Sequence, residues 1–287
     1  MKGKVQMCKS TTETITIVIV LYKMQLIDCL TYQTLINNIK NSKIDYSLIF
    51  YNNSSDIDIP LSSEYKVVNS KENGKLFRAY NFALNYSKKP DSKWLLLLDQ
   101  DTEITTEYIE KLDFFLNRNN NENIVAVVPI LKEGHKILSP KKISSFGWWE
   151  YNIKHSGFQE ERIVAFNSLT LININFIQSI GGFSSEYPLD MLDHWYYHQI
   201  NLFNKHVYVL DTEINHKLSL LNYEDNISLE RHIDFLEAER KFILTELSAS
   251  HYITYKLRLL FRLTKQLLFY KNKRYCRISF KSLCKIK

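Results

Sequence analysis

Short apolar runs alternate with amphipathic stretches along the first two thirds of the sequence. Residues 14–21 alternate Thr with Ile and then become largely β-branched, a pattern typical of a strand that enters a buried sheet. Five later runs are also short, apolar and bounded by Asn, Ser, Pro or Asp, and these predict strands at 47–51, 65–68, 93–98, 124–128 and 206–210.

The segments between these runs place apolar residues three and four positions apart. This spacing predicts helices at 24–39, 76–86, 105–116 and 192–203. Because helices and strands alternate, we expect an α/β fold with a mostly parallel sheet.

The pattern changes after Leu221. Residues 228–250 predict a long polar helix, and 253–268 predict a second helix that is strongly amphipathic, with Arg258, Arg262 and Lys265 opposite its apolar arc. The chain is therefore expected to divide near residue 222, into a body of residues 1–222 and a helical, basic, amphipathic region of residues 223–287. The apolar arc comprises Ile253, Leu257, Leu260, Phe261, Leu263, Leu267 and Leu268.

Charge and composition narrow the class of protein. With 287 residues, of which 45% are hydrophobic, the chain can bury a full core, which excludes disorder. The net charge is +6, but the segment after Glu246 has eleven basic residues and no acidic one, whereas the preceding part is net −5. This distribution predicts an anionic partner for the C-terminal region.

The sequence also bears on where the protein acts. Its longest apolar runs fall far below the roughly 18 residues that a spanning helix needs, and we expect the first apolar run to be a strand rather than a leader segment. The four cysteines form no close pair, which favours a reducing compartment.

The segment Lys93-Trp-Leu-Leu-Leu-Leu-Asp-Gln-Asp-Thr102 carries the clearest candidate chemistry. A predicted buried strand ends in Asp99 and Asp101, which lie where open α/β sheets bind ligands. Carboxylate oxygens suit Mg²⁺ or Mn²⁺, and such a cation would neutralise a diphosphate leaving group. The alternative is a turn that caps a helix beginning near Thr105.

Motifs of several other enzyme classes are absent from the sequence. We find no G-x-x-x-x-G-K-[ST], no G-x-G-x-x-G, no G-x-S-x-G and no evident Cys–His pair. The sequence therefore lacks the motifs of P-loop, dinucleotide-binding, α/β-hydrolase and thiol-protease chemistry.

The run "LLLLDQDT" resembles the nucleotide-sugar site of glycosyltransferases with the GT-A fold, and is most similar to the rhamnosyltransferase-like branch of family 2. The resemblance spans roughly residues 14–218. It implies the GT-A nucleotide-diphospho-sugar transferase fold, with a metal held by Asp99, Asp101 and His216, the last in "INHKLS".

Three further motifs resemble the donor half of that family. "TITIVIVLYKM" resembles the first strand and the turn that receives the nucleoside, which implies a donor contact at Tyr22. In "FYNNSSD", Asn52 (or Tyr51) stands where the family usually has an acidic residue for the base. "NSKENGKLFRAYNFAL" resembles the Asn-Gly loop, with Asn73 and Gly74; here Gly74 would permit a tight turn, and Lys75 or Arg78 could meet phosphate.

A later stretch resembles the acceptor half. Gly181-Gly182-Phe183 is similar to the "GGF" turn under the acceptor site, and Trp195 is expected on the same side. Asp193 matches the catalytic carboxylate, which would take the proton of the acceptor hydroxyl in an inverting transfer. We expect Asp190 to cap the helix or to contact the acceptor. The family's usual Arg is absent, with His198 or Gln199 in that region.

Together these motifs imply a metal-dependent inverting hexosyltransferase. The expected donor is dTDP-rhamnose, or a UDP-hexose, and the expected acceptor is a cell-surface polysaccharide or lipid-linked glycan. A non-catalytic scaffold subunit of a glycan-assembly complex is the alternative.

For the basic region we expect an anionic membrane surface rather than nucleic acid as the partner, with a homodimer interface as the competing use. The expected location is therefore cytoplasmic and peripheral, at the inner face of the plasma membrane.

Overall fold

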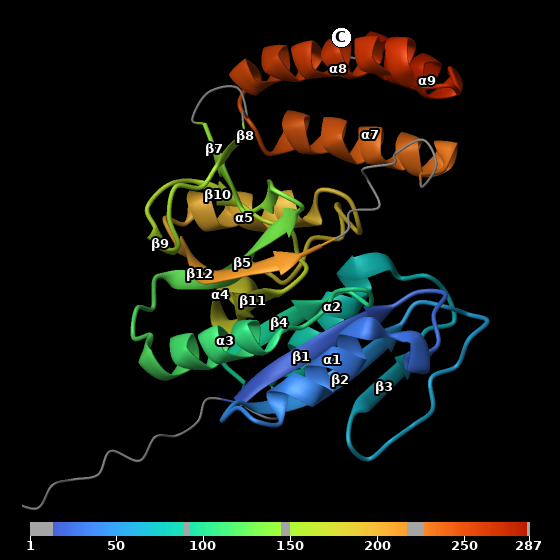
Figure 1. Cartoon of the computed structure of the whole chain (residues 1–287). Helices are drawn as coiled ribbons and strands as arrows, with labels where there is room; N and C mark the ends of the chain where they lie inside the picture. The colour runs from blue at the N-terminus through green and yellow to red at the C-terminus, as the bar shows by residue number, and fades with distance from the viewer. Residues whose placement is uncertain (1–13, 89–91, 145–149, 217–226, 286–287) are drawn as a thin grey trace, which may run out of the picture.

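The computed structural model describes residues 14–88, 92–144, 150–216 and 227–285. A large central sheet has helices on both faces, and a layer of helices from the end of the chain lies at one end of the molecule (Figure 1). The predicted α/β fold with a mostly parallel sheet is confirmed.

The central sheet has the order β3-β2-β1-β4-β11-β5-β12-β9, and β6 (Lys136–Ser139) pairs with β5. Parallel pairing joins β3 (Lys66–Asn69), β2 (Asp45–Asn52), β1 (Thr14–Leu21) and β4 (Trp94–Leu98), and also joins β5 (Ile124–Glu133) to β12 (His206–Asn215). The strands β11 (Thr170–Asn173) and β9 (Gly157–Gln159) are antiparallel to their neighbours.

Side chains of the buried strands alternate between two hydrophobic cores. In β4, Leu95 and Leu97 pack on one face, whereas Trp94, Leu96 and Leu98 pack on the other. All five are at most 2% exposed, as expected for a continuous apolar run in the middle of a sheet. The end of β4 is therefore held firmly between its two neighbours.

Helices cover both faces of this sheet. The helices α1 (Leu30–Ile39) and α3 (Thr106–Arg118) contribute to one core, and α2 (Lys75–Tyr86), α4 (Ile174–Ser179) and α5 (Leu192–Leu202) to the other. The helix predicted at 24–39 is shorter than expected, because its first part forms only the 3₁₀ turn η1 (Leu26–Asp28).

A small sheet and the C-terminal helices complete the structure. The small sheet has the order β10 (Ile163–Val164), β7 (Lys141–Ile143) and β8 (Glu150–Asn152). Beyond it lie α7 (Leu229–Thr245) and then an outer layer of α8 (Ala249–Phe269) and α9 (Arg274–Cys284) (Figure 1). Leu236, Phe242 and Tyr255 of α7 and α8 belong to the same hydrophobic core as α2 and α5.

Residue 222, where we expected the chain to divide, lies outside the described residues. The shared core shows that the C-terminal helices pack directly on the α/β body. Among the described residues, no helix combines the length and the hydropathy that a membrane-spanning segment requires.

Polar groups also join the C-terminal helices to one another. Arg262 of α8 donates from two nitrogens to Glu239 of α7, at 2.6 and 3.0 Å. Nearby, His232 Nε2 of α7 lies 3.1 Å from the Ser279 hydroxyl of α9, and its side chain is fully buried. Burial and the Arg262 charge lower the pKa of His232 to about 4.

This low pKa predicts that His232 makes the free energy of unfolding depend on pH. His232 stays neutral in the folded state, but the unfolded chain binds a proton near the ordinary histidine pKa of about 6.5. Its contribution is therefore complete above about pH 6.5 and is lost as the pH falls toward 4. Between about pH 7 and pH 5 we expect a loss of roughly 2 kcal/mol, which His232→Gln should remove.

Urea denaturation at several pH values measures this effect as the difference between the variant and the unsubstituted protein. His135→Gln is the matched control, because His135 is exposed in the turn between β5 and β6. If His232→Gln and His135→Gln gave the same pH profile, the buried neutral histidine would not be the cause.

Candidate active site

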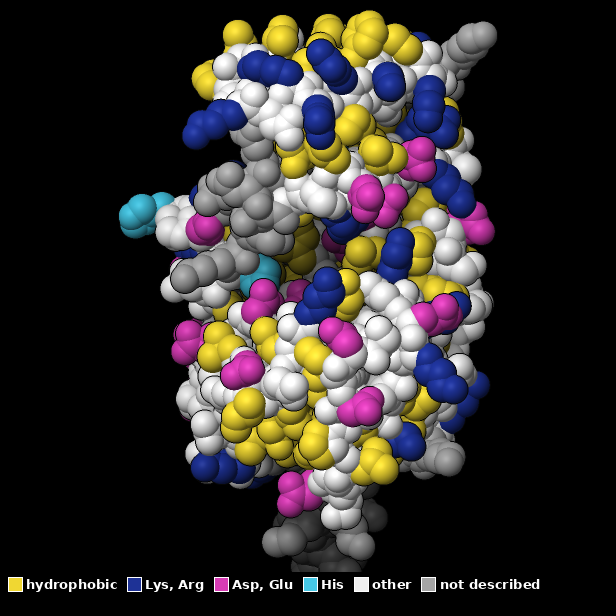
Figure 2. Space-filling view, turned by 90° about the vertical axis from the view of Figure 1, so that its right-hand side faces the viewer, with side chains coloured by type: hydrophobic (Ala, Val, Ile, Leu, Met, Phe, Trp, Pro, Cys, Tyr) yellow, Lys and Arg dark blue, Asp and Glu magenta, His cyan; other side chains and the backbone are white. Residues whose placement is uncertain are grey.

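A cleft of about 770 Å³ opens at the carboxyl ends of β1 and β4. Tyr22 follows β1, Asp99 and Asp101 follow β4, and His216 follows β12. The start of α7 forms another wall. Figure 2 looks onto this end of the sheet and shows a hollow there with acidic, basic and His side chains around it. The structure therefore brings the expected metal and donor residues of three strands to one place.

Asp99 is the most strongly perturbed carboxyl group in the cleft. Burial, together with the charges of Asp101 and Asp193, raises its pKa to about 6, although a hydrogen bond from Ser168 opposes the rise. Two carboxylates are thus held together where strand β4 cannot move away. Such a pair is stabilised by any cation that binds between them.

Gln100, between the two aspartates, connects β4 to β1. Its Oε1 accepts the Tyr22 N–H at 2.7 Å, and its Nε2 donates to the Tyr22 carbonyl at 3.2 Å. The side chain of Gln100 therefore fixes the backbone of the first-strand turn beside Asp99 and Asp101. Nothing in the sequence pattern indicates this role for Gln100.

His216 faces the cleft from the end of β12. Its Nδ1 lies 3.3 Å from the Thr102 hydroxyl, which lies 3.1 Å from the Ser168 hydroxyl. Burial lowers the pKa of His216, although the Asp101 charge opposes this, so its imidazole is neutral near pH 7. In the described part of the chain, no three His, Cys, Asp or Glu side chains form a metal site by themselves.

The turn after β2 presents Asn53, and not Asn52, to the cleft. Asn52 is fully buried: its Nδ2 donates to the carbonyl of Ile57 and, at 2.9 Å, to Oδ1 of Asn69. Because its amide holds the turn together, the structure does not support Asn52 as a base contact. Asn53 lies one residue further along and its Oδ1 accepts the N–H of Gly74 at 3.0 Å.

The Asn-Gly loop at the start of α2 differs from the expectation in detail. Asn73 lines the cleft, and Gly74 has an ordinary φ of −74°, so it does not provide a left-handed turn. Instead Lys75 has the positive φ of 57°. A Cβ atom on Gly74 would lie 2.9 Å from Cβ of Arg78. Because this distance is too short for two carbon atoms, the position favours glycine.

The two basic residues of this loop lie in different places. Lys75 lines the cleft, whereas Arg78 is half-exposed and forms an ion pair with Glu72. The structure therefore does not support Arg78 as a phosphate contact. Lys75, which the sequence offered as the other candidate, is in the right position.

Asp193 lies in the first turn of α5, next to His194. Its Oδ1 accepts the backbone N–H of His194 at 2.8 Å and lies 2.9 Å from Nδ1 of the same residue. The hydrogen bond and charge of Asp193 raise the pKa of His194 against the opposing effect of burial. Asp193 is also near enough to Asp99 to affect the pKa of that group.

Asp190 does not cap α5, because Met191 occupies the N-cap position with a φ of 62° and no side-chain cap. Instead the carboxylate of Asp190 accepts two hydrogen bonds from the guanidinium of Arg231 on α7, one of them at 2.6 Å. Arg231 in turn lines the cleft. This pair ties the start of α5 to the C-terminal helices.

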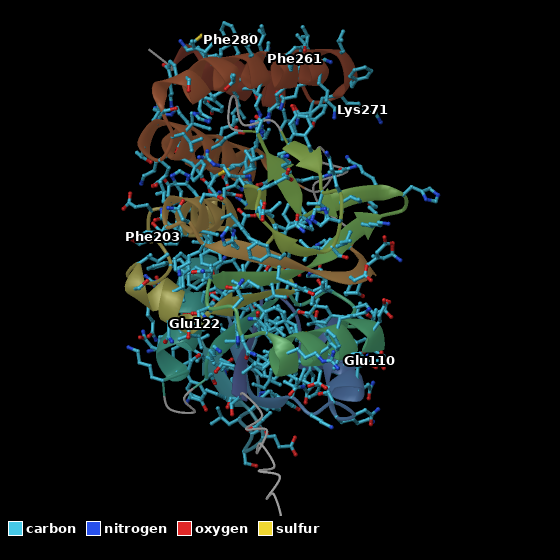
Figure 3. The ribbon with its side chains drawn as sticks, turned by 90° about the vertical axis from the view of Figure 1, so that its left-hand side faces the viewer. Glu110, Glu122, Phe203, Phe261, Lys271 and Phe280 are labelled. Carbon is cyan, nitrogen blue, oxygen red and sulfur yellow. The ribbon has the colours of Figure 1, made fainter. Side chains whose placement is uncertain are left out.

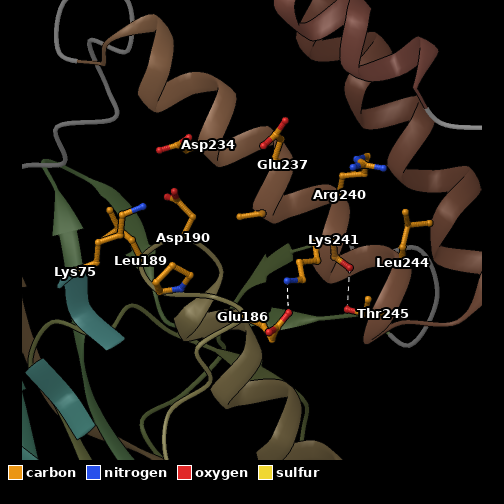
Figure 4. Close-up of a pocket in the computed structure, with 12 residues that line it drawn as sticks. Lys75, Glu186, Leu189, Asp190, Asp234, Glu237, Arg240, Lys241, Leu244 and Thr245 are labelled. Atoms are coloured by element: carbon orange, nitrogen blue, oxygen red, sulfur yellow. Dashed lines mark hydrogen bonds and ion pairs between the residues drawn. The ribbon is translucent and has the colours of Figure 1, made fainter. Parts of the chain in front are cut away.

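A groove of about 500 Å³ continues from the cleft along α7 and shares Lys75, Leu189 and Asp234 with it. Figure 4 shows charged side chains on both sides of this groove, including Asp190 and Lys241, which forms an ion pair with Glu186. The groove is therefore mixed in charge, and its lining also includes apolar side chains such as Leu189, Ala238 and Leu244.

The remaining acceptor-side residues lie elsewhere. Gly182 and Trp195 line a separate hollow beside α2, away from Asp99 and Asp101. Gly182 has a φ of 86°, and a Cβ there would lie 2.6 Å from Oδ1 of Asn81. Asn81 accepts the N–H of Phe183 at 3.0 Å, so the Gly-Gly-Phe turn is anchored to α2. The structure gives it a supporting role in packing.

Several residues of the site carry no signal in the sequence. Glu230, Arg231 and Asp234 come from α7, more than 120 residues after Asp101, and form one wall of the cleft. Asn53 lies one residue after Asn52, in the opposite direction to Tyr51, which was the alternative position expected from the sequence.

Carboxylates at the carboxyl ends of parallel strands, with basic side chains in the same cleft, define an α/β protein with a site for a phosphorylated ligand. The family model described as Glycosyl transferase family 2 matches residues 17–176, more than half of the chain. The chain therefore belongs to glycosyl transferase family 2, as expected from its motifs.

Solved structures show the same GT-A fold. GalNAc-T7, determined with UDP, GalNAc and Mn²⁺, matches with 10% identity and a TM-score of 0.59, over 95% of this chain and 55% of its own. The mannosyltransferase PcManGT of Pyrobaculum calidifontis, determined with GDP-Man and Mn²⁺, matches with 10% identity and a TM-score of 0.52, over 94% of this chain and 74% of its own. This chain thus spans about half the length of GalNAc-T7. No curated protein matches the sequence.

Proposed function

We propose that this protein is a metal-dependent inverting glycosyltransferase that moves a sugar from a nucleoside diphosphate onto a hydroxyl group of a glycan. The observation that carries this proposal is the meeting of Asp99 and Asp101 with Lys75 and Arg231 in one cleft, at the carboxyl ends of parallel strands. Family membership supports the same class of reaction.

The residues of the cleft fit a divalent cation. Burial and the neighbouring charge of Asp101 both raise the pKa of Asp99, so a cation bound there would stabilise its ionised form, and hard oxygen ligands suit Mg²⁺ or Mn²⁺. Asp101 and Asp99 would hold the ion together with diphosphate oxygens, and the neutral imidazole of His216 faces the same cleft. When bound, the ion would neutralise charge on the leaving diphosphate.

Lys75 is the chain's own contact for the diphosphate. It is a non-glycine residue in the left-handed region, at the first position of α2, and it lines the cleft with Asp99 and Asp101. Backbone strain of this kind is often retained at binding sites. On the other side of the cleft, the exposed side chain of Tyr22 is placed to receive the nucleoside, whereas Asn53 holds the loop at Gly74 and Lys75 through both ends of its amide.

Asp193 is the proposed general base. In the transfer, an acceptor hydroxyl oxygen forms a bond to the anomeric carbon while the bond from that carbon to the diphosphate oxygen breaks. The hydroxyl proton passes to the Asp193 carboxylate, and the nucleoside diphosphate leaves with the bonding electrons. His194 holds one oxygen of Asp193 through two contacts and so orients it.

The groove along α7 provides a path for the acceptor. Its mixture of carboxylates and ammonium groups offers both donors and acceptors for sugar hydroxyls, and it opens directly into the cleft. For the donor, the "LDQDT" resemblance favours dTDP-rhamnose, with UDP-hexoses as the competing class. The acceptor would be a cell-surface polysaccharide or a lipid-linked glycan.

Replacement of Asp193 by Asn should lower the rate of transfer by about 10²- to 10⁴-fold, because the amide cannot accept the proton. Binding of the donor should stay within about twofold, since other residues hold the nucleotide. The assay measures release of nucleoside diphosphate from dTDP-rhamnose, UDP-glucose and UDP-galactose, each with Mn²⁺ or Mg²⁺.

Glu110→Gln is the matched control, because Glu110 is an exposed carboxylate on α3 (Figure 3). A fully active Asp193→Asn protein would overturn the base assignment. If neither the unsubstituted protein nor any variant turned over a donor, we would conclude that the protein is a non-catalytic scaffold and not an enzyme.

A second pair of variants tests which basic residue binds the diphosphate. Lys75→Ala should weaken binding of dTDP and UDP by about 10- to 100-fold, the usual effect of losing a charge-assisted contact. Arg78→Ala should leave binding unchanged, because Arg78 is paired with Glu72 outside the cleft. Calorimetric titration measures both, and a larger effect of Arg78→Ala than of Lys75→Ala would contradict the placement.

A further inference from the structure

The apolar arc of α8 faces away from the protein. Phe261 and Leu268 are 68% and 73% exposed, and Ile253, Leu257, Leu260 and Leu267 are also exposed. Figure 3 shows Phe261 of α8 and Phe280 of α9 on the outer side of this last layer of helices. In the space-filling view, apolar side chains form a row along the same end of the molecule (Figure 2).

The opposite face of α8 packs against the protein, although it is the more polar one. Tyr255, Leu259 and Gln266 on this face are each 1% exposed. Arg262 lies on the same face and donates its two hydrogen bonds to Glu239 of α7. An amphipathic helix of a globular protein usually buries its apolar stripe. In α8, by contrast, the face that carries the Arg262–Glu239 pair is turned toward the protein, and the apolar stripe is turned away from it.

This orientation leaves an apolar surface that contains several large side chains on one helix. Scattered exposed apolar residues are ordinary, but a contiguous apolar surface rimmed by polar residues marks a site of interaction. The surface is continued by Phe280 on α9, which packs beside α8.

Basic side chains surround the apolar surface. No Asp or Glu occurs after Glu246, and the exposed cations of α8 and α9 include Lys265, Arg277 and Lys281. Figure 2 shows Lys and Arg side chains directly beside the apolar row. A surface with apolar side chains at its centre and cations at its edge matches the boundary of an anionic bilayer, where acyl chains meet negative headgroups.

We propose that α8 and α9 dock this protein onto an anionic lipid bilayer, with the apolar arc of α8 inserted between headgroups. A second copy of the chain fits less well, because symmetric contact would bring two strongly basic rims together. Nucleic acid also fits less well, because its phosphates would meet the apolar arc. The proposal does not depend on the enzymatic function assigned to the cleft.

Docking would set the direction in which the cleft faces. In Figure 1, α7 lies between the outer helices and the sheet, and the carboxyl ends of the strands point to the side. The cleft would therefore open alongside the bilayer rather than into it. A glycan attached to a lipid could reach the groove beside α7 without leaving the membrane.

Co-sedimentation with lipid vesicles tests the proposal. The full chain should bind vesicles of phosphatidylcholine and phosphatidylglycerol in equal parts, and this binding should weaken as salt is raised. The double variant Phe261→Ser and Leu268→Ser should bind at least about tenfold more weakly, because two large apolar side chains no longer insert. Vesicles of phosphatidylcholine alone should bind weakly.

The matched control is the double variant Ile27→Ser and Leu61→Ser. These apolar side chains are 78% and 84% exposed, but they lie before α1 and in the loop between β2 and β3, far from the outer helices. The control should bind as the unsubstituted protein does, and circular dichroism should show both variants folded.

Three results would overturn the proposal. The first is no binding of the full chain to anionic vesicles, and the second is equal loss of binding in the two double variants. The third is a full chain that does not bind vesicles but forms a dimer, detected by light scattering, which the double variant Phe261→Ser and Leu268→Ser dissociates.

Discussion

The site depends on a concentration of negative charge at the end of strand β4. This strand is buried on both faces and lies between β1 and β11, so Asp99 cannot withdraw from the sheet. Burial, together with the charge of Asp101 two residues away, raises the pKa of Asp99 to about 6. An anionic ligand that binds here must be accompanied by positive charge, and Lys75 supplies part of that charge from α2, whereas Arg231 is already paired with Asp190.

The C-terminal helices belong to the same arrangement. Arg231 joins α7 to the start of α5 through Asp190, and Arg262 joins α8 to α7 through Glu239. In the first pair, Arg231 lines the cleft and Asp190 lines the adjoining groove. The second pair lies on the inner face of α8 with the buried Tyr255 and Leu259, so the apolar arc of α8 is left facing outward. The proposed catalytic and membrane-binding features are thus connected by two ion pairs along one helix.

Much of the fold could be predicted from the sequence, because the runs at β1 and β4 and the periodicity of α2, α3 and α5 are local properties. The strand β11 was missed, since Thr170–Asn173 is too short and too close to α4 to be told from a buried helix segment.

Asp99 and Asp101 could be placed at the edge of the sheet by position alone. Arg231 could not, because only tertiary packing brings α7 to the cleft. The arc of α8 could be identified as apolar, but the direction it faces depends on Glu239, which lies on another helix.

We propose above all that Asp99 and Asp101 bind a nucleoside diphosphate together with a divalent cation. Calorimetric titration of dTDP and UDP into the protein, with Mn²⁺ and then with a chelator, tests it most directly. We expect binding that requires Mn²⁺ and that is lost in Asp101→Asn while the variant stays folded. Binding of equal strength with the chelator, or in Asp101→Asn, would contradict the account.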